Sequence, residues 1–351
     1  VDSGPSRNYP EIGGVVAVES MPRPPAPSVS EGQTIAENLI SGLPEVRLLL
    51  AAPRGFCAGV RRAIQAVRDA LEHHGAPVYV RRAIVHKMAV VRELEREGAV
   101  FIEEVEEAPA GSIVIFSAHG VAPEVVEAAR SRGLKAYDAV CPLVAKVHRE
   151  VERHHRDGRR IILIGHAGHP EIRGTLGHLP HGSAILVNSL EEIDRLEIPD
   201  DSPVSYAVQT TYAVDEAASL IDALRIRFAN LVGPSSSDIC YATTNRQAAV
   251  RAIASRSQAV IVAGEQFSSN ARRLAEVASG LCSSVQLIAG ADELDWRLLP
   301  GGGCIGLTAA ASTPDNIVTQ IVDALASRYA IRVEEIEAAE ESTVFKPMAV
   351  G

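Results

Sequence analysis

Short apolar runs alternate with longer amphipathic stretches along most of the chain. Three runs have the length and residue types of buried strands: RLLLAA (47–52), RIILIG (160–165) and AVIVAG (259–264). Apolar residues recur at spacings of three and four elsewhere, which predicts helices in GVRRAIQAVRDALEHHG (59–75), PLVAKVHREVERHHRDG (142–158) and RQAAVRAIASR (246–256). Strands that alternate with helices of this length predict parallel sheets joined by right-handed βαβ crossovers, and therefore an α/β fold.

The chain reads as three diverged copies of one α/β unit. Each copy contributes one cysteine at the start of a predicted helix, namely Cys57, Cys141 and Cys240. A polar residue follows the next strand in the same register from each cysteine, to within one residue, at His86, His169 and Ser268. The last strand of each copy ends at His119, Thr210 or Ser312, with a drift that loop insertions explain. Such self-similarity predicts three pseudo-repeated modules, each with a small parallel sheet.

The carboxyl ends of parallel strands carry the loops and helix starts at which ligands bind. If the three modules face one another, three thiols and a ring of His, Thr, Ser and Asn side chains converge on one cavity. We expect residues 1–45 to form a disordered extension rich in Pro, Gly and Ser. The three modules are predicted at 46–136, 137–234 and 235–330, and a C-terminal tail at 331–351. The tail is predicted to form a strand and then an exposed segment that packs back on a neighbouring module.

Composition and charge narrow the class of protein. The length of 351 residues suits two or three modules of about 100 residues each. The net charge of −10 argues against binding nucleic acid or anionic lipid, and favours a small substrate or a protein electron donor as the partner. No apolar run approaches the roughly 20 residues of a membrane span, and the first residues lack the pattern of a secretory signal. We therefore expect a cytoplasmic protein.

The cysteines suggest metal binding. Five widely spaced cysteines do not make a disulfide framework. A helix start lowers the pKa of a thiol and favours the thiolate that binds metal. One such cysteine taken alone is more often a buried structural residue, but the repeated register favours ligands. Cys282 and Cys304 lack that register and are predicted to be structural. Three thiolates suit zinc, although close Cys-x-x-Cys pairs are absent, or an iron–sulfur cluster with one open iron that acts as a Lewis acid.

Polar residues at the predicted strand ends suggest an anionic substrate. Glu171, in HAGHPE, is the one carboxylate at the repeated positions and is the best candidate for a proton donor; the alternative is a solvated loop glutamate. Near other strand ends and helix starts lie side chains that suit a phosphate or diphosphate: His86, His119, Ser268, Ser269, Asn270 and Ser312. A nucleotide is not implied, because the chain has neither a P-loop nor a strict GxGxxG motif.

Seven motifs occur in order between about Arg47 and the tail: PRGFCAGV, SAHGV, DAVCPLV, GHAGHPE, QTT, DICYATTNRQ and SSN. They closely resemble those of the 4-hydroxy-3-methylbut-2-enyl diphosphate reductase family, also called LytB or IspH. The resemblance implies a trefoil-like α/β fold around a [4Fe–4S] cluster held by Cys57, Cys141 and Cys240. In that family two electrons and two protons remove the substrate hydroxyl as water, and isopentenyl and dimethylallyl diphosphates are released. This is the last step of the non-mevalonate route to isoprenoids.

The same resemblance assigns roles to individual residues. Glu171 delivers protons, and Thr210 helps to orient the substrate hydroxyl at the open iron. The diphosphate contacts are expected at His86, His119, His169, Ser268, Ser269, Asn270 and Ser312. The electrons would come from a ferredoxin or a flavodoxin.

The chain departs from the family pattern near the diphosphate end. Gln266 and Phe267 replace a common Lys-Asn pair, Ala271 replaces a hydroxyl residue, and Ala310 replaces a glycine whose backbone would approach phosphate more closely. Two alternatives to the reductase follow. One is a diverged paralogue that acts on another allylic diphosphate, and the other is a cluster-binding redox sensor without turnover.

Overall fold

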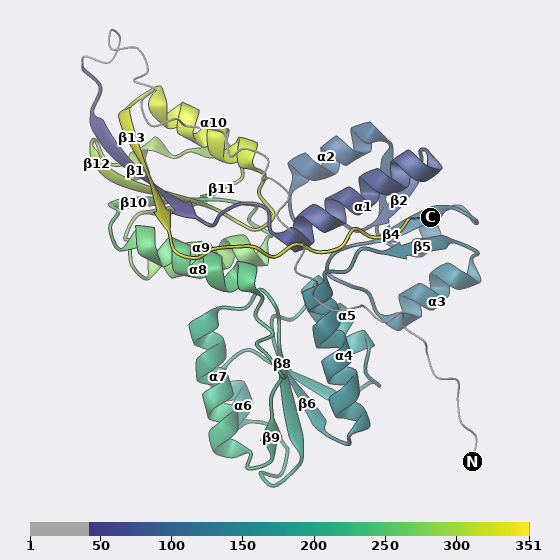
Figure 1. Ribbon diagram of the computed structural model, residues 1–351. Coiled ribbons are helices and arrows are strands. Elements are labelled where there is room, and N and C mark those ends of the chain that lie inside the picture. The colour runs from purple at the N-terminus through teal and green to yellow at the C-terminus, as the bar shows by residue number, and fades with distance from the viewer. Residues whose placement is uncertain (1–41, 351) are drawn as a thin grey trace, which may run out of the picture. The chain divides into compact units, whose positions relative to one another are not determined.

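The computed structural model describes residues 42–350, shown in Figure 1. Most of the extension predicted at 1–45 lies outside the described residues. Residues 42–350 form three parallel sheets, which Figure 1 shows as three lobes around a common centre. The predicted fold class, an α/β protein with three small parallel sheets in a trefoil-like arrangement, is confirmed.

The first sheet has the strand order β3-β2-β4-β5. Its strands are β2 (Val78–Arg81), β3 (Ala99–Ile102), β4 (Ile113–Phe116) and β5 (Lys135–Asp138). Its helices are α1 (Ala58–His74), α2 (Met88–Glu97) and α3 (Pro123–Ser131), with a short 3-10 helix, η1, at Val105–Glu107. The apolar face of α1 packs against β2 and β4, which accounts for the three- and four-residue spacing of its buried positions.

The second sheet has the strand order β7-β6-β8-β9. Its strands are β6 (Arg160–Ile164), β7 (Ala184–Val187), β8 (Val204–Val208) and β9 (Leu231–Val232). Its helices are α4 (Pro142–Arg156), α5 (Pro170–Gly177), α6 (Leu190–Asp194) and α7 (Val214–Arg227). Helices α4 and α5 pack on one face of this sheet and α7 packs on the other.

The third sheet has the strand order β11-β10-β12-β1-β13. Its strands are β1 (Glu45–Ala52), β10 (Ala259–Ala263), β11 (Val285–Ile288), β12 (Gly303–Ala309) and β13 (Ala330–Glu337). Its helices are α8 (Tyr241–Ala254), α9 (Ser269–Ser279) and α10 (Asp315–Ala326), with 3-10 helices η2 (Ala291–Glu293) and η3 (Trp296–Leu298). Helix α10 covers one face, and α8 and α9 cover the other (Figure 1).

The position of β1 corrects one expectation from the sequence. The sequence predicts this strand in the first module, but it lies in the third sheet, between β12 and β13. Leu48 and Leu50 join the core under α10, while Leu49 and Ala51 pack against α8. A strand that is apolar on both faces needs cover on both, and the interior of this five-stranded sheet provides it. The other module boundaries stay a prediction.

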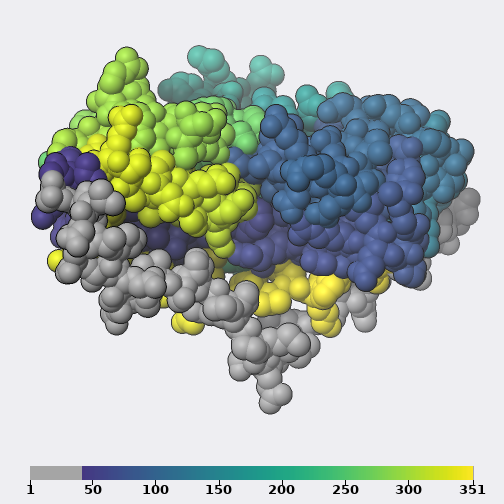
Figure 2. Space-filling view, turned by 90° about the horizontal axis from the view of Figure 1, so that it is seen from above, coloured from purple at the N-terminus to yellow at the C-terminus, as the bar shows by residue number. Residues whose placement is uncertain are grey.

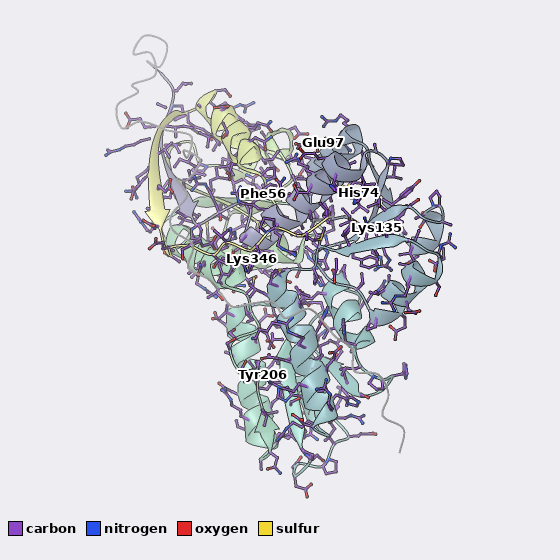
Figure 3. The ribbon with its side chains drawn as sticks, turned by 45° about the vertical axis from the view of Figure 1, so that its right-hand side comes forward. Phe56, His74, Glu97, Lys135, Tyr206 and Lys346 are labelled. Atoms are coloured by element: carbon purple, nitrogen blue, oxygen red, sulfur yellow. The ribbon has the colours of Figure 1, made fainter. Side chains whose placement is uncertain are left out.

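The predicted C-terminal strand is confirmed as β13, and an extended segment follows it. Residues 338–350, which we call the C-terminal strap, run from the third sheet to the first sheet (yellow in Figure 1). Lys346 lies on this path (Figure 3). In the space-filling view, yellow atoms lie along the edge of the purple and blue N-terminal part (Figure 2). Within residues 42–350, no helix combines the length and the apolar character that a membrane span requires.

Candidate functional site

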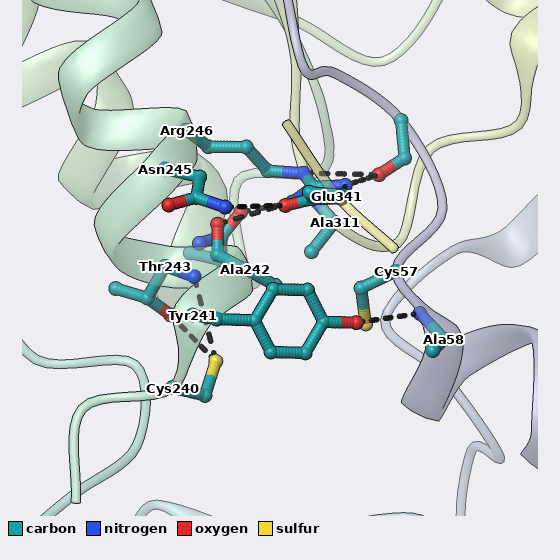
Figure 4. A network of polar contacts seen from close by, with 12 residues as sticks. Cys57, Ala58, Cys240, Tyr241, Ala242, Thr243, Asn245, Arg246, Ala311 and Glu341 are labelled. Atoms are coloured by element: carbon teal, nitrogen blue, oxygen red, sulfur yellow. Dashed lines mark hydrogen bonds and ion pairs between the residues drawn. The ribbon is translucent and has the colours of Figure 1, made fainter. Parts of the chain in front are cut away.

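Each of the three predicted ligand cysteines is the N-terminal capping residue of a helix. Cys57 precedes α1, Cys141 precedes α4 and Cys240 precedes α8. The Cys57 thiol accepts from the amide of Val60 at 3.5 Å, and the Cys240 thiol accepts from the amide of Thr243 at 3.4 Å (Figure 4 shows the latter bond). The prediction that each of these cysteines opens a helix is confirmed.

The backbone ties each cysteine to the end of a strand from another part of the fold. The amide of Cys57 donates to the carbonyl of Ala311 at 3.2 Å, that of Cys141 to Ala118 at 3.0 Å, and that of Cys240 to Thr210 at 3.1 Å. These three acceptors lie at, or one residue before, the repeated strand-end positions His119, Thr210 and Ser312. The register repeat in the sequence therefore corresponds to a hydrogen bond that recurs three times in space.

The thiols approach one another around Gly59. A β-carbon at this position would lie 2.8 Å from the sulfur of Cys141 and 3.8 Å from the sulfur of Cys57. Glycine therefore leaves space between two thiols that any other residue would fill. In residues 42–350, no group of three or more His, Cys, Asp or Glu side chains is placed to hold a single metal ion.

Burial changes the expected chemistry of two thiols. It raises the pKa of Cys141 to about 12, helped by the charges of Cys57 and Cys240 and opposed by backbone N–H groups at the helix start. Burial likewise raises the pKa of Cys240 to about 11, with Cys57 as the next cause. The N–H groups of the helix start lower both pKa values, as expected, but desolvation outweighs them, so that each pKa is raised. A bound metal would have to supply the positive charge that deprotonates them.

Glu171 and Thr210 lie together near Cys240. Glu171, in the first turn of α5, is only 2% exposed. Its two carboxylate oxygens accept from the amide of Thr210 at 2.7 Å and from the Thr210 hydroxyl at 2.8 Å. Burial raises the pKa of Glu171 to about 7; the bonds from Thr210 oppose the rise, and the charge of Asp238 adds to it. This carboxyl is therefore buried and able to exchange a proton near neutral pH, unlike a solvated loop glutamate.

Three histidines from different segments form a cluster. The ring centroids of His86 and His119 are 4.3 Å apart, and each lies 6.0 Å from that of His169. Burial lowers the pKa of His86 to about 4 and that of His169 to about 3, and holds the pKa of His119 well below its usual value. All three rings are therefore neutral at pH 7, and each can donate one hydrogen bond.

Within residues 42–350, three of the candidate substrate contacts have buried polar atoms without a hydrogen-bond partner. These atoms are Nε2 of His86, Nε2 of His169 and Nδ2 of Asn270. Buried polar groups in proteins are nearly always hydrogen-bonded, so unpaired ones call for a further group at the site. All three can donate, which suits an anion as that group.

The remaining candidates lie at the start of α9 and in the loop after β12. Ser268 caps α9 by accepting from the amide of Ala271, and Ser269 contacts the side chains of Gln209 and Thr211 at 3.3 Å. Asn270 accepts from the amide of Ala311 at 2.9 Å, and Ser312 donates to the carbonyl of His86 at 3.1 Å. All four side chains are buried. These contacts join the third sheet to the other two at the predicted site.

The departures from the family pattern have different surroundings. Phe267 is 49% exposed, and its ring meets that of His86 edge-on at 5.8 Å. Gln266 turns to the carbonyl of Leu287 at 2.9 Å. Ala310 and Ala271 are fully buried in the apolar core between the third sheet and α9, so their methyl groups fill core space.

Three residues at the site were not singled out from the sequence. Asp238 is buried, accepts from the amide of Val208 and pairs with Lys146 at 3.1 Å; burial raises its pKa to about 6. Gln209, within the QTT motif, contacts Ser269 and Thr211. The exposed Arg272 contributes to the lowered pKa values of His86 and His169. The sequence signal for Asp238 and Gln209 was their membership of the DICYATTNRQ and QTT motifs, and for Arg272 it was proximity to SSN.

Comparisons with a family model and with individual known proteins point to the same family. Residues 48–326 match the family described as LytB protein. The 4-hydroxy-3-methylbut-2-enyl diphosphate reductase of Paracoccus denitrificans is 50% identical over 86% of this chain and 96% of its own. That of Gluconobacter oxydans is 48% identical over 91% of this chain and 97% of its own.

Two solved structures point to the same family. The E-1-hydroxy-2-methyl-but-2-enyl-4-diphosphate reductase of Plasmodium falciparum matches with a TM-score of 0.82 and 36% identity, over 87% of this chain and 96% of that one. A second structure, of the (E)-4-hydroxy-3-methyl-but-2-enyl diphosphate reductase described as the terminal enzyme of the non-mevalonate pathway, has a TM-score of 0.59 and 33% identity, over 80% of this chain and 99% of that one. With its fold, its motifs and these relatives in agreement, the chain belongs to the LytB protein family.

Proposed function

We propose that this chain is a 4-hydroxy-3-methylbut-2-enyl diphosphate reductase. The reaction takes up two electrons and two protons, breaks the bond between carbon and the substrate hydroxyl, and releases water with isopentenyl or dimethylallyl diphosphate. The observation that carries the proposal is that a buried carboxyl, three thiols and a set of unpaired buried donors lie at one place, at the ends of strands from three sheets.

The proposed cofactor is a [4Fe–4S] cluster held by Cys57, Cys141 and Cys240. The three cysteines start three separate helices, so a group that bridges them suits the site better than one ion. The space left by Gly59 between two sulfurs, and the burial of the Cys141 and Cys240 thiols, fit such a group. When bound, the cluster would supply electrons and one iron without a protein thiolate. A one-electron protein donor, a ferredoxin or a flavodoxin, is the proposed source of the electrons.

Glu171 is the proposed proton donor. Its pKa of about 7 means that a large fraction carries a proton at neutral pH, and burial keeps water from competing for it. The proton goes to the leaving hydroxyl oxygen, which departs as water. Thr210 holds the carboxyl with two bonds and keeps its own hydroxyl oxygen free to accept from the substrate hydroxyl.

The diphosphate is proposed to bind the histidine cluster and the start of α9. The unpaired nitrogens of His86, His169 and Asn270 would donate to phosphate oxygens. His119, Ser268, Ser269 and Ser312 line the same region and would add donors. The helix start favours negative charge, and fixing the diphosphate would hold the allyl chain in one orientation at the thiols.

The test is anaerobic turnover of 4-hydroxy-3-methylbut-2-enyl diphosphate by cluster-reconstituted protein with a reduced viologen dye. Iron and sulfide are measured on the same sample. Formation of the two five-carbon diphosphates supports the proposal. A full cluster of about four irons per chain without product would contradict it and favour the alternatives.

One observation favours a diverged paralogue as the second candidate. Phe267 places an apolar ring edge against His86, where the substrate diphosphate is proposed to bind. A different allylic diphosphate would then be the better substrate.

For a redox sensor, Glu171→Gln should leave the response almost unchanged, whereas an enzyme should lose most turnover and keep its cluster. The expectation of a cytoplasmic protein stays a prediction.

A further inference from the structure

The C-terminal strap contacts the third sheet's helix α8 through a buried ion pair. Glu341 accepts from the guanidinium of Arg246 at 2.7 Å and 3.3 Å, and also from the amide of the Asn245 side chain at 3.3 Å. Arg246 is completely buried, and Glu341 is 17% exposed. A buried guanidinium needs a nearby anion, and Glu341 is its carboxylate partner.

The same guanidinium holds the loop that carries Cys57. Its Nε and Nη2 donate to the carbonyl of Gly55 at 3.1 Å and 2.8 Å, two residues before the cysteine. Gly55 has a φ of +68° and is closely surrounded, since a β-carbon there would lie 2.8 Å from Asp315. The loop therefore has one well-defined path, and Arg246 fixes it from α8, the helix that begins after Cys240.

A second part of the strap reaches the loop of Cys141 through another arginine. Nε of Arg62, on α1, donates to the carbonyl of Lys346 at 3.1 Å. Nη1 of the same side chain donates to the carbonyl of Val140 at 3.0 Å, one residue before Cys141. The guanidinium thus bridges the strap and the second thiol loop.

The end of the strap is anchored on the first sheet. Tyr137, on β5, donates its hydroxyl proton to the carbonyl of Val350 at 3.0 Å. Met348 and Val350 pack against the core formed by α1 and its sheet. The strap is therefore held near both ends and in the middle. The arginines that bind Glu341 and Lys346 each also bind a thiol loop.

We propose that the C-terminal strap positions Cys57 and Cys141 around the cluster, with Glu341 and Arg62 as positioning residues. The proposal rests on the proposed function, since it presumes the cluster. Glu341 orients Arg246, which holds the Gly55 carbonyl, and Arg62 couples Lys346 to Val140. Loss of either contact leaves the thiols present but allows their loops to move, so the cluster is released more easily and its electronic environment changes.

The experiment compares full-length Glu341→Gln with Glu340→Gln. Glu340 is exposed and makes no hydrogen bond or ion pair with the part of the chain that the structure describes, so it controls for the loss of one charge. Both variants are reconstituted without oxygen, and the bleaching of the visible cluster absorbance is followed after addition of an iron chelator. We expect loss about tenfold faster in Glu341→Gln than in wild type, because its amide cannot neutralise the buried Arg246, and an unchanged rate in Glu340→Gln.

A second readout separates positioning from general stability. The reduction potential and the electron paramagnetic resonance spectrum of the reduced cluster are recorded at a temperature where both proteins are folded. We expect both to shift in Glu341→Gln and to match wild type in Glu340→Gln. If Glu341→Gln does not fold, Arg62→Gln tests the second contact by the same measurements. If a positioning variant and wild type release the cluster at the same rate and have the same spectra, the proposal is overturned. If wild type takes up no cluster, the proposed function is overturned instead.

Discussion

The backbone amide and the hydroxyl of Thr210 both donate to the carboxyl of Glu171, at 2.7 Å and 2.8 Å. The carbonyl of the same threonine accepts from the amide of Cys240 at 3.1 Å. One residue thus fixes the proposed proton donor and one proposed cluster ligand. Three hydrogen bonds set their separation, and two of these bonds are donated by backbone amides.

The rate of turnover should fall as the pH rises through about 7. Burial raises the pKa of Glu171 to about 7, and only the protonated carboxyl can donate to the leaving oxygen. The measurement is the pH dependence of kcat with saturating reductant. In Thr210→Val the hydroxyl bond that lowers the pKa of Glu171 is lost, so the falling limb should move to higher pH. Thr210→Ser keeps the hydroxyl and serves as the control, so its falling limb should stay at the wild-type pH. If the falling limb of Thr210→Val also stays at the wild-type pH, Glu171 is excluded as the donor.

Glu171 should also make the folded protein less stable as the pH rises. Below its ordinary pKa of 4.5 the group is protonated in both states and has no effect. Between 4.5 and about 7 the unfolded chain loses the proton and the folded protein keeps it, so the free energy of unfolding falls, by at most about 3 kcal/mol. Glu171→Gln removes this ionisation.

We therefore expect Glu171→Gln to be more stable than wild type near pH 8 and to converge with it near pH 5. The measurement is urea unfolding of the cluster-free protein at both pH values. Glu340→Gln removes an exposed carboxyl and should follow wild type throughout. If Glu171→Gln differs from wild type by the same free energy of unfolding at both pH values, the result contradicts the raised pKa of Glu171.

Gly59→Ala should impair cluster binding without unfolding the protein. The new β-carbon would lie 2.8 Å from the sulfur of Cys141, closer than such atoms approach, so the sulfur has to move. Alanine favours the helix that contains this position, so the helix itself should persist. The measurement is iron per chain after reconstitution, together with circular dichroism of the cluster-free protein.

Gly301→Ala is the matched control, because a β-carbon there meets no atom of residues 42–350 within 4 Å. We expect a full cluster in this variant and less than half the iron in Gly59→Ala. Equal iron content in the two proteins would mean that the space beside Gly59 is not used by the cluster.

Phe267→Asn should improve binding of the diphosphate substrate. The phenyl ring is half-exposed and lies edge-on to His86 at 5.8 Å, and it offers phosphate no donor, whereas an amide does. We expect KM to fall roughly threefold with little change in kcat, since the ring is not near the thiols in the proposed mechanism. Leu281→Asn removes another exposed apolar side chain and should leave KM unchanged. A KM that rises in Phe267→Asn would contradict the prediction, because it would mean that the ring contributes to binding of this substrate.

Much of the site follows from local patterns. The helices after Cys57, Cys141 and Cys240 were predictable because their apolar spacing and their start signals are properties of contiguous residues. The register of His86, His169 and Ser268 was also readable, since each follows a strand by a short loop. These features depend on backbone geometry within one α/β unit, which a sequence repeat records directly.

Contacts between distant segments were decided by the tertiary structure. The strand β1 lies between β12 and β13 because both of its faces are apolar, and only the assembled third sheet covers both. Burial by surrounding modules raises the pKa of Cys141 and Cys240, whereas the local helix start alone predicted the opposite. The pairing of Arg246 with Glu341 joins residues far apart in the chain. The sequence by itself determined which side chains end each strand and start each helix, and the tertiary structure decided their neighbours and their charge, because desolvation and long-range pairing depend on how the whole chain packs.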